Sequence, residues 1–344
     1  DRCLGIPPGG AHTLEWSLYA IPGGDYWDLI NAVRRAWGAN FTLEGPVDFP
    51  CGRRFNYINA RRQTADDVRE WLAENHNALP WVMTHVAVNP NIAMATATPD
   101  NPAFKHGTAI LDAPAWIDMT RKLVTLLKEV DPKVKVFAYL HKNLCTEVGS
   151  AEKYPDSAAL DARPGVFVPT PENSYGKALA KVYRFLVEDI GANLYLDEIS
   201  HAYRVVGDGE TVWDGCTVAI DPGSHAVTGR RSSGFLLVQP WLADLMDYLE
   251  SQGRSAFANM APITRTAAGW RLQHFTEDTG PSGVISMHLS TPLAWSYRRG
   301  AAGFRHLMES LDYGGIAFSR GGDWSDHLFP ITPIELRAGI VIAE

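Results

Sequence analysis

The sequence predicts an α/β protein and, within that class, a (β/α)8 barrel of the TIM type. Segments with strand periodicity alternate with helical segments about eight times along the 344 residues, and no long run of hairpins interrupts them. No GxGxxG or GxxxxGK(S/T) motif follows an early strand, so nothing supports a dinucleotide site or a P-loop. A doubly wound open sheet is the alternative architecture. We assign residues 1–333 to the barrel and residues 334–344 to a terminal helix or to the lead into a further domain.

The first half of the chain supplies strands and helices in alternation. They are the strands 14–20, 40–44, 81–88 and 135–141 and the helices 26–37, 64–75 and 116–130, with residues 47–62 as a loop. Strand 14–20 is predicted because apolar and polar residues alternate along it. Asp25 can cap the first helix and Gly38 can end it. Thr64 followed by Asp67 resembles an N-cap with an acidic third residue, which opens the second helix.

The second half continues the alternation. It supplies the strands 193–197, 255–260, 270–276 and 316–319 and the helices 175–189, 240–252 and 304–311. Gly191 and the pair Gly314–Gly315 end the helices before the strands at 193 and 316. The connection from His201 to Phe235 is Gly-rich and longer than an ordinary loop, and loops of that length are usually functional or disordered. Two adjacent acids, Asp197 and Glu198, close the strand at 193, where α/β enzymes place their chemistry.

Composition and charge exclude several kinds of partner. The formal net charge of −8 argues against nucleic acid or an anionic membrane as the main partner. No apolar run reaches the roughly 18 residues that are needed to span a bilayer. The chain starts at Asp1 without Met and both ends read as cut, so a removed signal peptide fits, and an extracellular or periplasmic location is slightly favoured. No motif indicates a cofactor.

The cysteines do not predict a metal site. All four, Cys3, Cys51, Cys145 and Cys216, are widely spaced and form no CxxC, which disfavours structural zinc. Buried thiols and one or two disulfides both stay open.

If the barrel is correct, the polar residues that end its strands converge on one mouth. These residues are rich in carboxylates and aromatics: Glu44, His85, Tyr139, His141, Asp197, Glu198, His201, Asn259, Glu277, Asp278, Asp323 and Trp324. Acyl transfer through Ser or Cys is disfavoured, because GxSxG is absent and Cys145 has no recognisable local signature. A metal site is also disfavoured, because no HExxH or other close-spaced pair occurs among the available His85, His141, Asp197 and Glu277.

Paired carboxylates in an aromatic pocket fit glycoside hydrolysis best. One acid protonates the leaving oxygen, and a second group stabilises or attacks the anomeric carbon. We expect burial and the charge of Asp197 to keep Glu198 protonated near neutral pH. The residues expected to bind the carbohydrate substrate are Tyr139, His141, Tyr195, His201, Asn259, Glu277, Asp278 and Trp324. The competing interpretations are that Asp197 caps the next segment with Glu198 solvated, and that the aromatics only pack in the core.

The segment Tyr195-Leu196-Asp197-Glu198 resembles the active site of a known group of enzymes. An adjacent Asp-Glu pair at a barrel strand end is similar to the catalytic pair of β-N-acetylhexosaminidases and β-N-acetylgalactosaminidases. In those families the 2-acetamido group of the substrate is the nucleophile. The resemblance implies an exo-acting enzyme that releases N-acetylgalactosamine or N-acetylglucosamine, with Asp197 orienting the acetamido group and Glu198 as general acid/base. A Tyr commonly completes the acetamido pocket, and the candidates are Tyr139, Tyr195 and Tyr297.

One feature departs from that family pattern. There the pair usually closes the fourth strand, whereas the count above places it on the fifth. Either the count includes one strand too many or the likeness is convergent. A vaguer resemblance, to barrel α-glycosidases with two separated acids, would pair Asp197 with Glu277 or Asp278. Two further hypotheses stay open: a conventional retaining glycosidase that uses Asp197 or Glu198 with Glu277, and a catalytically silent carbohydrate-binding barrel.

Overall fold

A computed structural model gives the fold. It describes residues 4–39, 47–48, 64–74, 81–84, 87–88, 104–158, 165–200, 204–206, 212–260, 264–277, 293–296 and 316–319.

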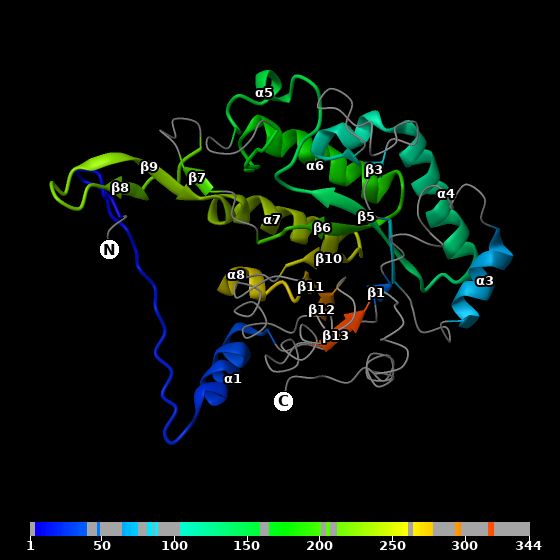
Figure 1. The fold of residues 1–344 in the computed structure, drawn as a ribbon, viewed down its shortest axis with the longest axis horizontal. Coiled ribbons are helices and arrows are strands. Elements are labelled where there is room, and N and C mark those ends of the chain that lie inside the picture. Colours follow the sequence, from blue (N-terminus) through cyan, green and yellow to red (C-terminus); the bar gives the residue numbers. More distant parts are fainter. Residues whose placement is uncertain are drawn as a thin grey trace.

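One parallel sheet of eight strands organises the chain (Figure 1). In sheet order these are β1 (Val47–Asp48), β2 (Trp81–Thr84), β5 (Lys135–His141), β6 (Asn193–Asp197), β10 (Ala256–Asn259), β11 (Gln273–Glu277), β12 (Leu293–Ser296) and β13 (Ile316–Ser319). Every neighbouring pair is parallel, and the order follows the chain without a reversal. The predicted α/β class with a parallel sheet is confirmed.

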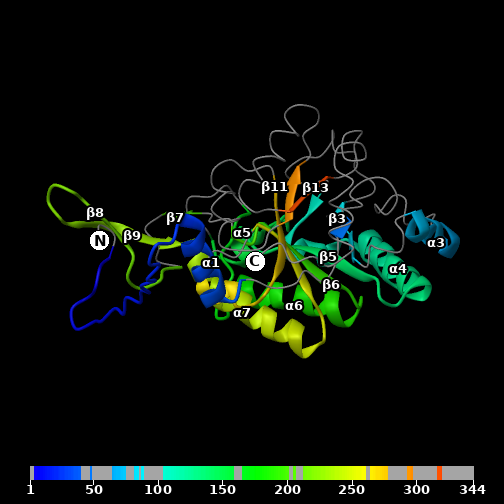
Figure 2. The same cartoon turned by 90° about the horizontal axis from the view of Figure 1, so that it is seen from below.

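Helices cover one face of the central strands. Helices α4 (Pro114–Val130), α6 (Ser174–Glu188) and α7 (Gly234–Ser251) form a layer beside β5 and β6 in Figure 2. Their apolar residues bury one core together with alternate residues of the strands, among them Val136, Ala138, Leu194 and Leu196. Burial of this apolar surface is the main favourable term that holds the layers together.

The intervening strand residues lie on the opposite face and contact one another there. Tyr139 packs against Tyr195 with ring centroids 5.6 Å apart, and Phe257 packs against both Tyr195 at 6.0 Å and Phe137 at 6.2 Å. All four rings are buried. Because side chains alternate with a period of two, the residues that end these strands continue this aromatic face.

The predicted helix caps are confirmed. Helix α1 (Tyr26–Trp37) begins with a reciprocal capping box, in which Asp25 accepts from the backbone of Asp28 and Asp28 accepts from the backbone of Asp25. Gly38 ends it with φ of 69°. Helix α3 (Ala65–Glu74) begins at Thr64, whose backbone N–H and hydroxyl both donate to Asp67.

The segment Leu14–Ala20 was predicted to be the first strand, and this prediction is wrong. It is extended chain, with Leu14, Trp16 and Leu18 about four-fifths exposed at 80%, 78% and 84%. Alternation gives these side chains a common face, but a strand also needs a neighbour for its N–H and C=O groups. Within the described part of the chain, no backbone hydrogen bond joins residues 11–20 to another segment.

Three smaller differences follow. Residues Val47–Asp48, assigned to a loop, form β1, and β12 was not predicted. Helix α7 begins at Gly234, so Pro240 lies inside it. A proline removes one helical hydrogen bond, here to the carbonyl of Leu236. Both Pro240 and Leu236 are exposed, so water can satisfy that carbonyl.

The long connections build structure of their own. The one before α4 contains β3 (Ala87–Val88) paired with β4 (Phe104–Lys105), and the 3-10 helix η2 (Gly107–Asp112). The connection predicted as the loop from His201 to Phe235 contains an antiparallel sheet of β7 (Arg204–Val206), β9 (Val227–Ser233) and β8 (Val218–Ile220). This sheet projects from the body beside the N-terminal segment (Figure 1), where Leu4 pairs with Thr217. Two short helices, α5 (Ser150–Lys153) and α8 (Arg265–Ala268), complete the described elements.

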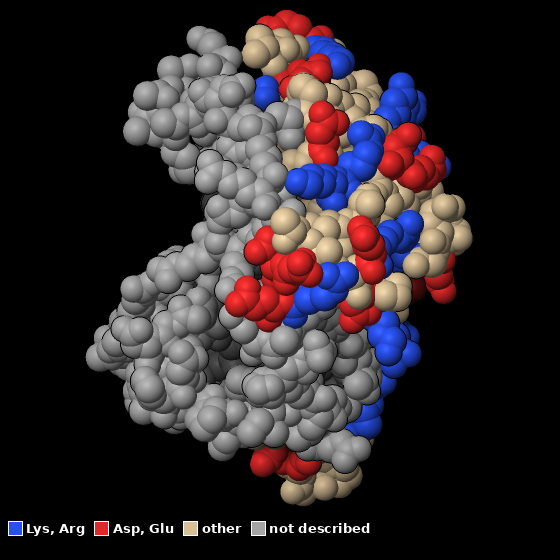
Figure 3. Space-filling view, turned by 90° about the vertical axis from the view of Figure 1, so that its right-hand side faces the viewer, with Lys and Arg blue, Asp and Glu red and all other residues tan. Residues whose placement is uncertain are grey.

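The surface carries both signs of charge. On the face shown in Figure 3, acidic and basic side chains are interspersed over the described part. Of the helices described, none is both long and apolar enough to cross a membrane. The predicted strand 40–44, the helix 304–311 and the terminal segment 334–344 lie outside the described residues.

Candidate active site

The parallel register brings the strand ends together. His141 at the end of β5 is the Cα partner of Asp197 at the end of β6, and Ala258 of β10 is the partner of Leu196. Asn259 follows Ala258, so it ends β10 beside Asp197. Three segments separated by about 60 residues therefore present polar side chains at one edge of the sheet, on the aromatic face.

Asp197 accepts three hydrogen bonds from uncharged donors. Tyr139 Oη donates to Oδ2 over 2.9 Å, while Tyr195 Oη and Asn259 Nδ2 donate to Oδ1 over 3.1 and 2.9 Å. The three donors come from β5, β6 and β10, and each is almost completely buried. The carboxylate is thus an acceptor held in one orientation by three rigid strands.

Glu198 has a different environment. It is the first residue after β6, its side chain is 34% exposed, and its Oε2 lies 3.2 Å from His141 Nε2. His141 Nδ1 accepts from the backbone N–H groups of Asn143 and Leu144 over 3.1 and 2.9 Å. Nδ1 therefore carries no hydrogen, and the neutral ring must donate from Nε2 to Glu198. Burial lowers the pKa of His141 despite the hydrogen bond to Glu198 and the nearby charge of Asp197, so the ring stays neutral at neutral pH.

A buried lysine lies behind the same pair. Lys142 directly follows His141, and its Nζ donates to the backbone carbonyl of Glu198 over 2.5 Å. Burial lowers its pKa to about 7, although the charges of Glu198 and Asp197 raise it. Lys142 was not predicted from the sequence. The available signal was its position, directly after a strand with a polar end.

A second histidine reaches Asp197 through Tyr139. His106 Nδ1 lies 3.2 Å from Tyr139 Oη, and the two rings are 5.5 Å apart. Because the single hydrogen of Tyr139 Oη goes to Asp197, the hydroxyl accepts from His106, which places a hydrogen on His106 Nδ1. His106 follows a short strand in the long connection before α4, where sequence periodicity gives no signal for a site residue.

The backbone is strained beside two of these residues. Glu198 has φ of 50° and Met260, next to Asn259, has φ of 73°. Residues other than glycine rarely adopt this left-handed conformation, and such strain concentrates at functional sites. Ile199 N–H donates to the carbonyl of Asn259 over 3.0 Å, which ties the two strained turns together.

The loop after β5 is fixed by its own polar network. Glu147 accepts from Thr108 over 2.5 Å, from Tyr154 over 3.0 Å, and from Lys153. Burial raises the pKa of Glu147, but these hydrogen bonds outweigh it and lower the pKa overall. The loop that supplies the two backbone donors to His141 is therefore anchored.

The structure brings together six of the ten residues that the sequence nominated for the site: Tyr139, His141, Tyr195, Asp197, Glu198 and Asn259. Glu277 ends β11, two strands from β6, and only its backbone is described. The other three, His201, Asp278 and Trp324, lie outside the described residues, as do Glu44, His85 and Asp323.

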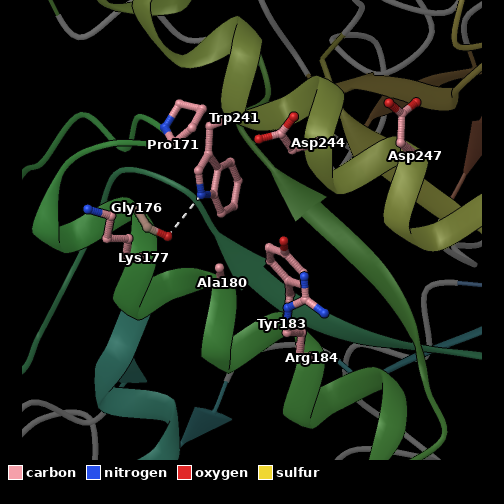
Figure 4. A pocket seen from close by; sticks show the side chains of 9 residues that line it. All are labelled: Pro171, Gly176, Lys177, Ala180, Tyr183, Arg184, Trp241, Asp244 and Asp247. Carbon is pink, nitrogen blue, oxygen red and sulfur yellow. Dashed lines mark hydrogen bonds between the residues drawn. The ribbon is translucent and has the colours of Figure 1, made fainter.

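Other features of the described chain give weaker grounds for a functional site. No three His, Cys, Asp or Glu side chains there come together as metal ligands. Cys145 and Cys216 are free thiols, while Cys3 and Cys51 lie outside the description. A groove of about 390 Å³ runs between α6 and α7 (Figure 4). Its buried Trp241 donates to the Gly176 carbonyl over 3.0 Å and so packs the two helices together.

Comparison with known proteins does not assign the chain to a family. No family model matches the chain, and no curated protein matches it.

Proposed function

We propose that the chain is a glycoside hydrolase that releases β-linked N-acetylhexosamines by substrate assistance. The observation that carries the proposal is the contrast between two adjacent carboxylates. Asp197 is held by three neutral donors, whereas Glu198 is one-third exposed and contacts a neutral histidine. Pairs of acids with different environments are the arrangement in which one acid orients or stabilises and the other transfers protons.

The reaction would proceed in two balanced steps. The acetamido oxygen of the substrate forms a bond to the anomeric carbon as the glycosidic carbon–oxygen bond breaks, and Glu198 gives its proton to the departing oxygen. Asp197 accepts a hydrogen bond from the acetamido N–H and stabilises the positive charge that develops on the oxazolinium ring. Water then adds to the anomeric carbon, loses its proton to Glu198, and the acetamido group is restored.

The hydrogen-bond capacity of Asp197 supports its role. An ionised carboxylate offers about four acceptor positions. Among the described residues, donors occupy three of them, two on Oδ1 and one on Oδ2. One acceptor position on Oδ2 suits a single N–H, which is what a 2-acetamido group supplies.

The strand order supports the resemblance to the hexosaminidase families. In the order of the sheet β6 is the fourth strand, and β6 ends at Asp197. The sequence count placed the pair on the fifth strand because it included Leu14–Ala20, which is not a strand. Counted among the described strands, the pair therefore lies at the position that the resemblance implies.

We also propose that the eight strands close into a (β/α)8 barrel. All eight are parallel and follow chain order without the reversal of a doubly wound sheet. Closure would place β1 beside β13. Cysteines introduced in pairs, one at Val47 or Asp48 and one between Ile316 and Ser319, test this. A disulfide that forms without loss of folding supports closure, because bridged Cα atoms must lie within about 7 Å; an open sheet would yield none.

The function is tested with matched aryl glycosides. We expect hydrolysis of 4-nitrophenyl 2-acetamido-2-deoxy-β-hexosides and none of the corresponding 2-hydroxy glycosides. A thiazoline mimic of the oxazolinium intermediate should inhibit, since it resembles a species formed only in substrate assistance. Equal turnover of both substrates would instead indicate a conventional two-carboxylate reaction with Glu277 as the second acid. Binding of sugar without turnover by any substrate would indicate a carbohydrate-binding barrel.

Two variants test the separate roles proposed for Glu198 and Asp197. Glu198→Gln should cut turnover of substrates with poor leaving groups by about two to four orders of magnitude. Activated aryl glycosides should lose less, because their leaving group needs little protonation. Asp197→Asn should impair both alike, because the acetamido group must be oriented whatever leaves. The same leaving-group dependence in both variants would contradict these roles.

A further inference from the structure

Two consecutive residues at the end of β5 hold one residue at the end of β6. His141 donates to the carboxylate of Glu198 over 3.2 Å, and Lys142 donates to its backbone carbonyl over 2.5 Å. Lys142 is 3% exposed. Among the described residues, that carbonyl is its one hydrogen-bond partner. The side chain and the main chain of Glu198 are therefore held by two neighbouring residues, the last residue of β5 and the residue after it.

The hydrogen bond from Lys142 to the backbone carbonyl of Glu198 is made at a residue whose backbone conformation is strained. Glu198 has φ of 50°, a conformation that side chains with a Cβ rarely adopt. Such a turn persists only when its surroundings fix it. The ammonium of Lys142 binds the carbonyl of this residue, and the next N–H, that of Ile199, donates to Asn259 O. The turn directs the Glu198 side chain toward His141.

The ammonium of Lys142 also interacts electrostatically with the carboxylates of Glu198 and Asp197. The titratable groups whose charges act on Lys142 are Glu198 and Asp197, from β6 and its turn, and the charge of Lys142 acts in turn on His141 of β5. Burial lowers the pKa of Lys142 to about 7, so its charge changes near neutral pH. A hydrogen bond from an ammonium is about twice as strong as one from a neutral donor.

Building on the proposed function, we infer that Lys142 is the positioning residue of the general acid: it holds the Glu198 turn and couples the ionisation of Glu198 to its own charge. If Lys142 were purely structural, it would support the turn but would not alter the pH at which Glu198 loses its proton.

The chain offers a matched control at the other end of β6. Lys128 Nζ donates to the carbonyl of Gly191 over 3.0 Å, and Gly191 also has a left-handed φ, of 77°. It precedes β6, so Lys128 makes the same kind of contact away from the carboxylate pair. Lys128→Met should cost stability but leave the site chemistry unchanged.

The activity test is the pH dependence of kcat/KM for an N-acetylhexosaminide with a poor leaving group, since only there does turnover depend strongly on the proton of Glu198. In Lys142→Met we expect about tenfold lower activity from the loosened turn. We also expect the alkaline limb to move up by roughly one pH unit, because a neighbouring cation favours the ionised acid. Lys142→Arg, which keeps a cation, should retain the wild-type limb, and Lys128→Met should too. An unmoved limb in Lys142→Met, with Glu198→Gln inactive, overturns the inference and leaves the proposed function intact.

A second readout needs no turnover. Glu198-Ile199 is the only Glu-Ile pair in the 344 residues, so labelling Glu with 13C at the carbonyl and Ile with 15N isolates one carbonyl signal. In the wild type this signal should shift with pH around a midpoint near the lysine pKa of about 7. Because the Glu198 carboxyl itself titrates, the readout is the component with a midpoint near the lysine pKa of about 7, which should vanish in Lys142→Met or Lys142→Gln, whichever folds, and persist in Lys128→Met. A component near that pH that survives when Lys142 is removed together with Glu198→Gln, with the 13C label moved to Gln, overturns the inference even if no glycoside is ever hydrolysed.

Discussion

Asn259 and Asp197 are separated by 62 positions in the sequence, yet Asn259 Nδ2 donates to Asp197 Oδ1 over 2.9 Å across β10 and β6. The contact depends on the parallel register of two strands, in which Ala258 pairs with Leu196. A donor on one strand thus orients a carboxylate on the next, and strands hold such geometry better than loops do.

Replacing this donor tests how much the orientation matters. Asn259→Ala should lower kcat by about ten- to a hundredfold, because small misplacements of a reacting group cost that much. Asn193 is the matched control, since it also bridges strands, donating to Val136 O over 3.3 Å and accepting from Ser255 N over 2.8 Å at the other end of β6. Asn193→Ala should reduce stability in urea and leave kcat unchanged. Equal kcat losses in the two variants would show that only general packing is involved.

The two tyrosines that donate to Asp197 should contribute unequally to kcat. Tyr139 is the donor to Oδ2, whereas Oδ1 has both Tyr195 and Asn259. Tyr139→Phe should therefore reduce kcat more than Tyr195→Phe, by roughly an order of magnitude against a severalfold loss, in line with the loss of one buried hydrogen bond. Tyr248→Phe is the control, because its hydroxyl donates to Glu188 Oε1 over 2.7 Å, between α7 and α6, and not to the pair. The reverse order of losses would mean that Oδ1 is the oxygen that meets the substrate.

A buried histidine should make the fold sensitive to acid. Burial lowers the pKa of His274 from 6.5 to about 4, against a hydrogen bond to the Leu272 carbonyl that raises it. Between these pH values the unfolded chain binds the proton and the folded chain does not, so stability falls as pH drops from about 6.5 to about 4. The loss should approach about 3 kcal/mol. Urea unfolding at several pH values measures it.

His274→Asn isolates that contribution. Its amide can replace the Nδ1 donor to the Leu272 carbonyl at 2.8 Å but cannot take up a proton. The pH dependence should therefore be shallower than in the wild type below pH 6.5 and parallel to it above. Identical slopes throughout would assign the acid sensitivity to other groups.

Local signals predicted the parts of the fold that depend on neighbouring residues. The cap at Asp25, the end at Gly38 and the strand Lys135–His141 were all read correctly, because caps and strand periodicity lie within a few residues of each other in sequence. The prediction failed at Leu14–Ala20, where alternation is present but no strand in the described part of the chain pairs with the segment. Strand pairing is not local, so periodicity alone cannot decide it.

The same contrast between local and non-local signals explains which site residues could be predicted. Asp197, His141 and Asn259 were nominated because each ends a strand, and parallel strands bring their ends together. His106 and Lys142 were missed. His106 comes from a connection whose course no periodicity predicts, and Lys142 reads as an ordinary surface lysine until burial shows otherwise.

Gly107 packs against the loop that holds His141. It has φ of 60°, and a Cβ there would lie 2.5 Å from Tyr175 Oη and 2.6 Å from the Leu144 carbonyl oxygen. Gly38 is the matched control, with φ of 69° and no atom within 4 Å of a Cβ. Gly38→Ala should cost about 1 kcal/mol, from the left-handed conformation alone. Gly107→Ala should cost about 1–3 kcal/mol more, because the backbone of Leu144 must move.

The same displacement should reach the chemistry. Leu144 N–H donates to His141 Nδ1 over 2.9 Å and so fixes the ring that donates to Glu198. Gly107→Ala should therefore lower kcat at a temperature where the variant is fully folded, whereas Gly38→Ala should not. Chemical denaturation and kinetics on the same preparations check both effects. A Gly107→Ala variant that is destabilised but fully active would show that the His141 contact survives movement of Leu144, and would separate the anchoring of the loop from the positioning of Glu198.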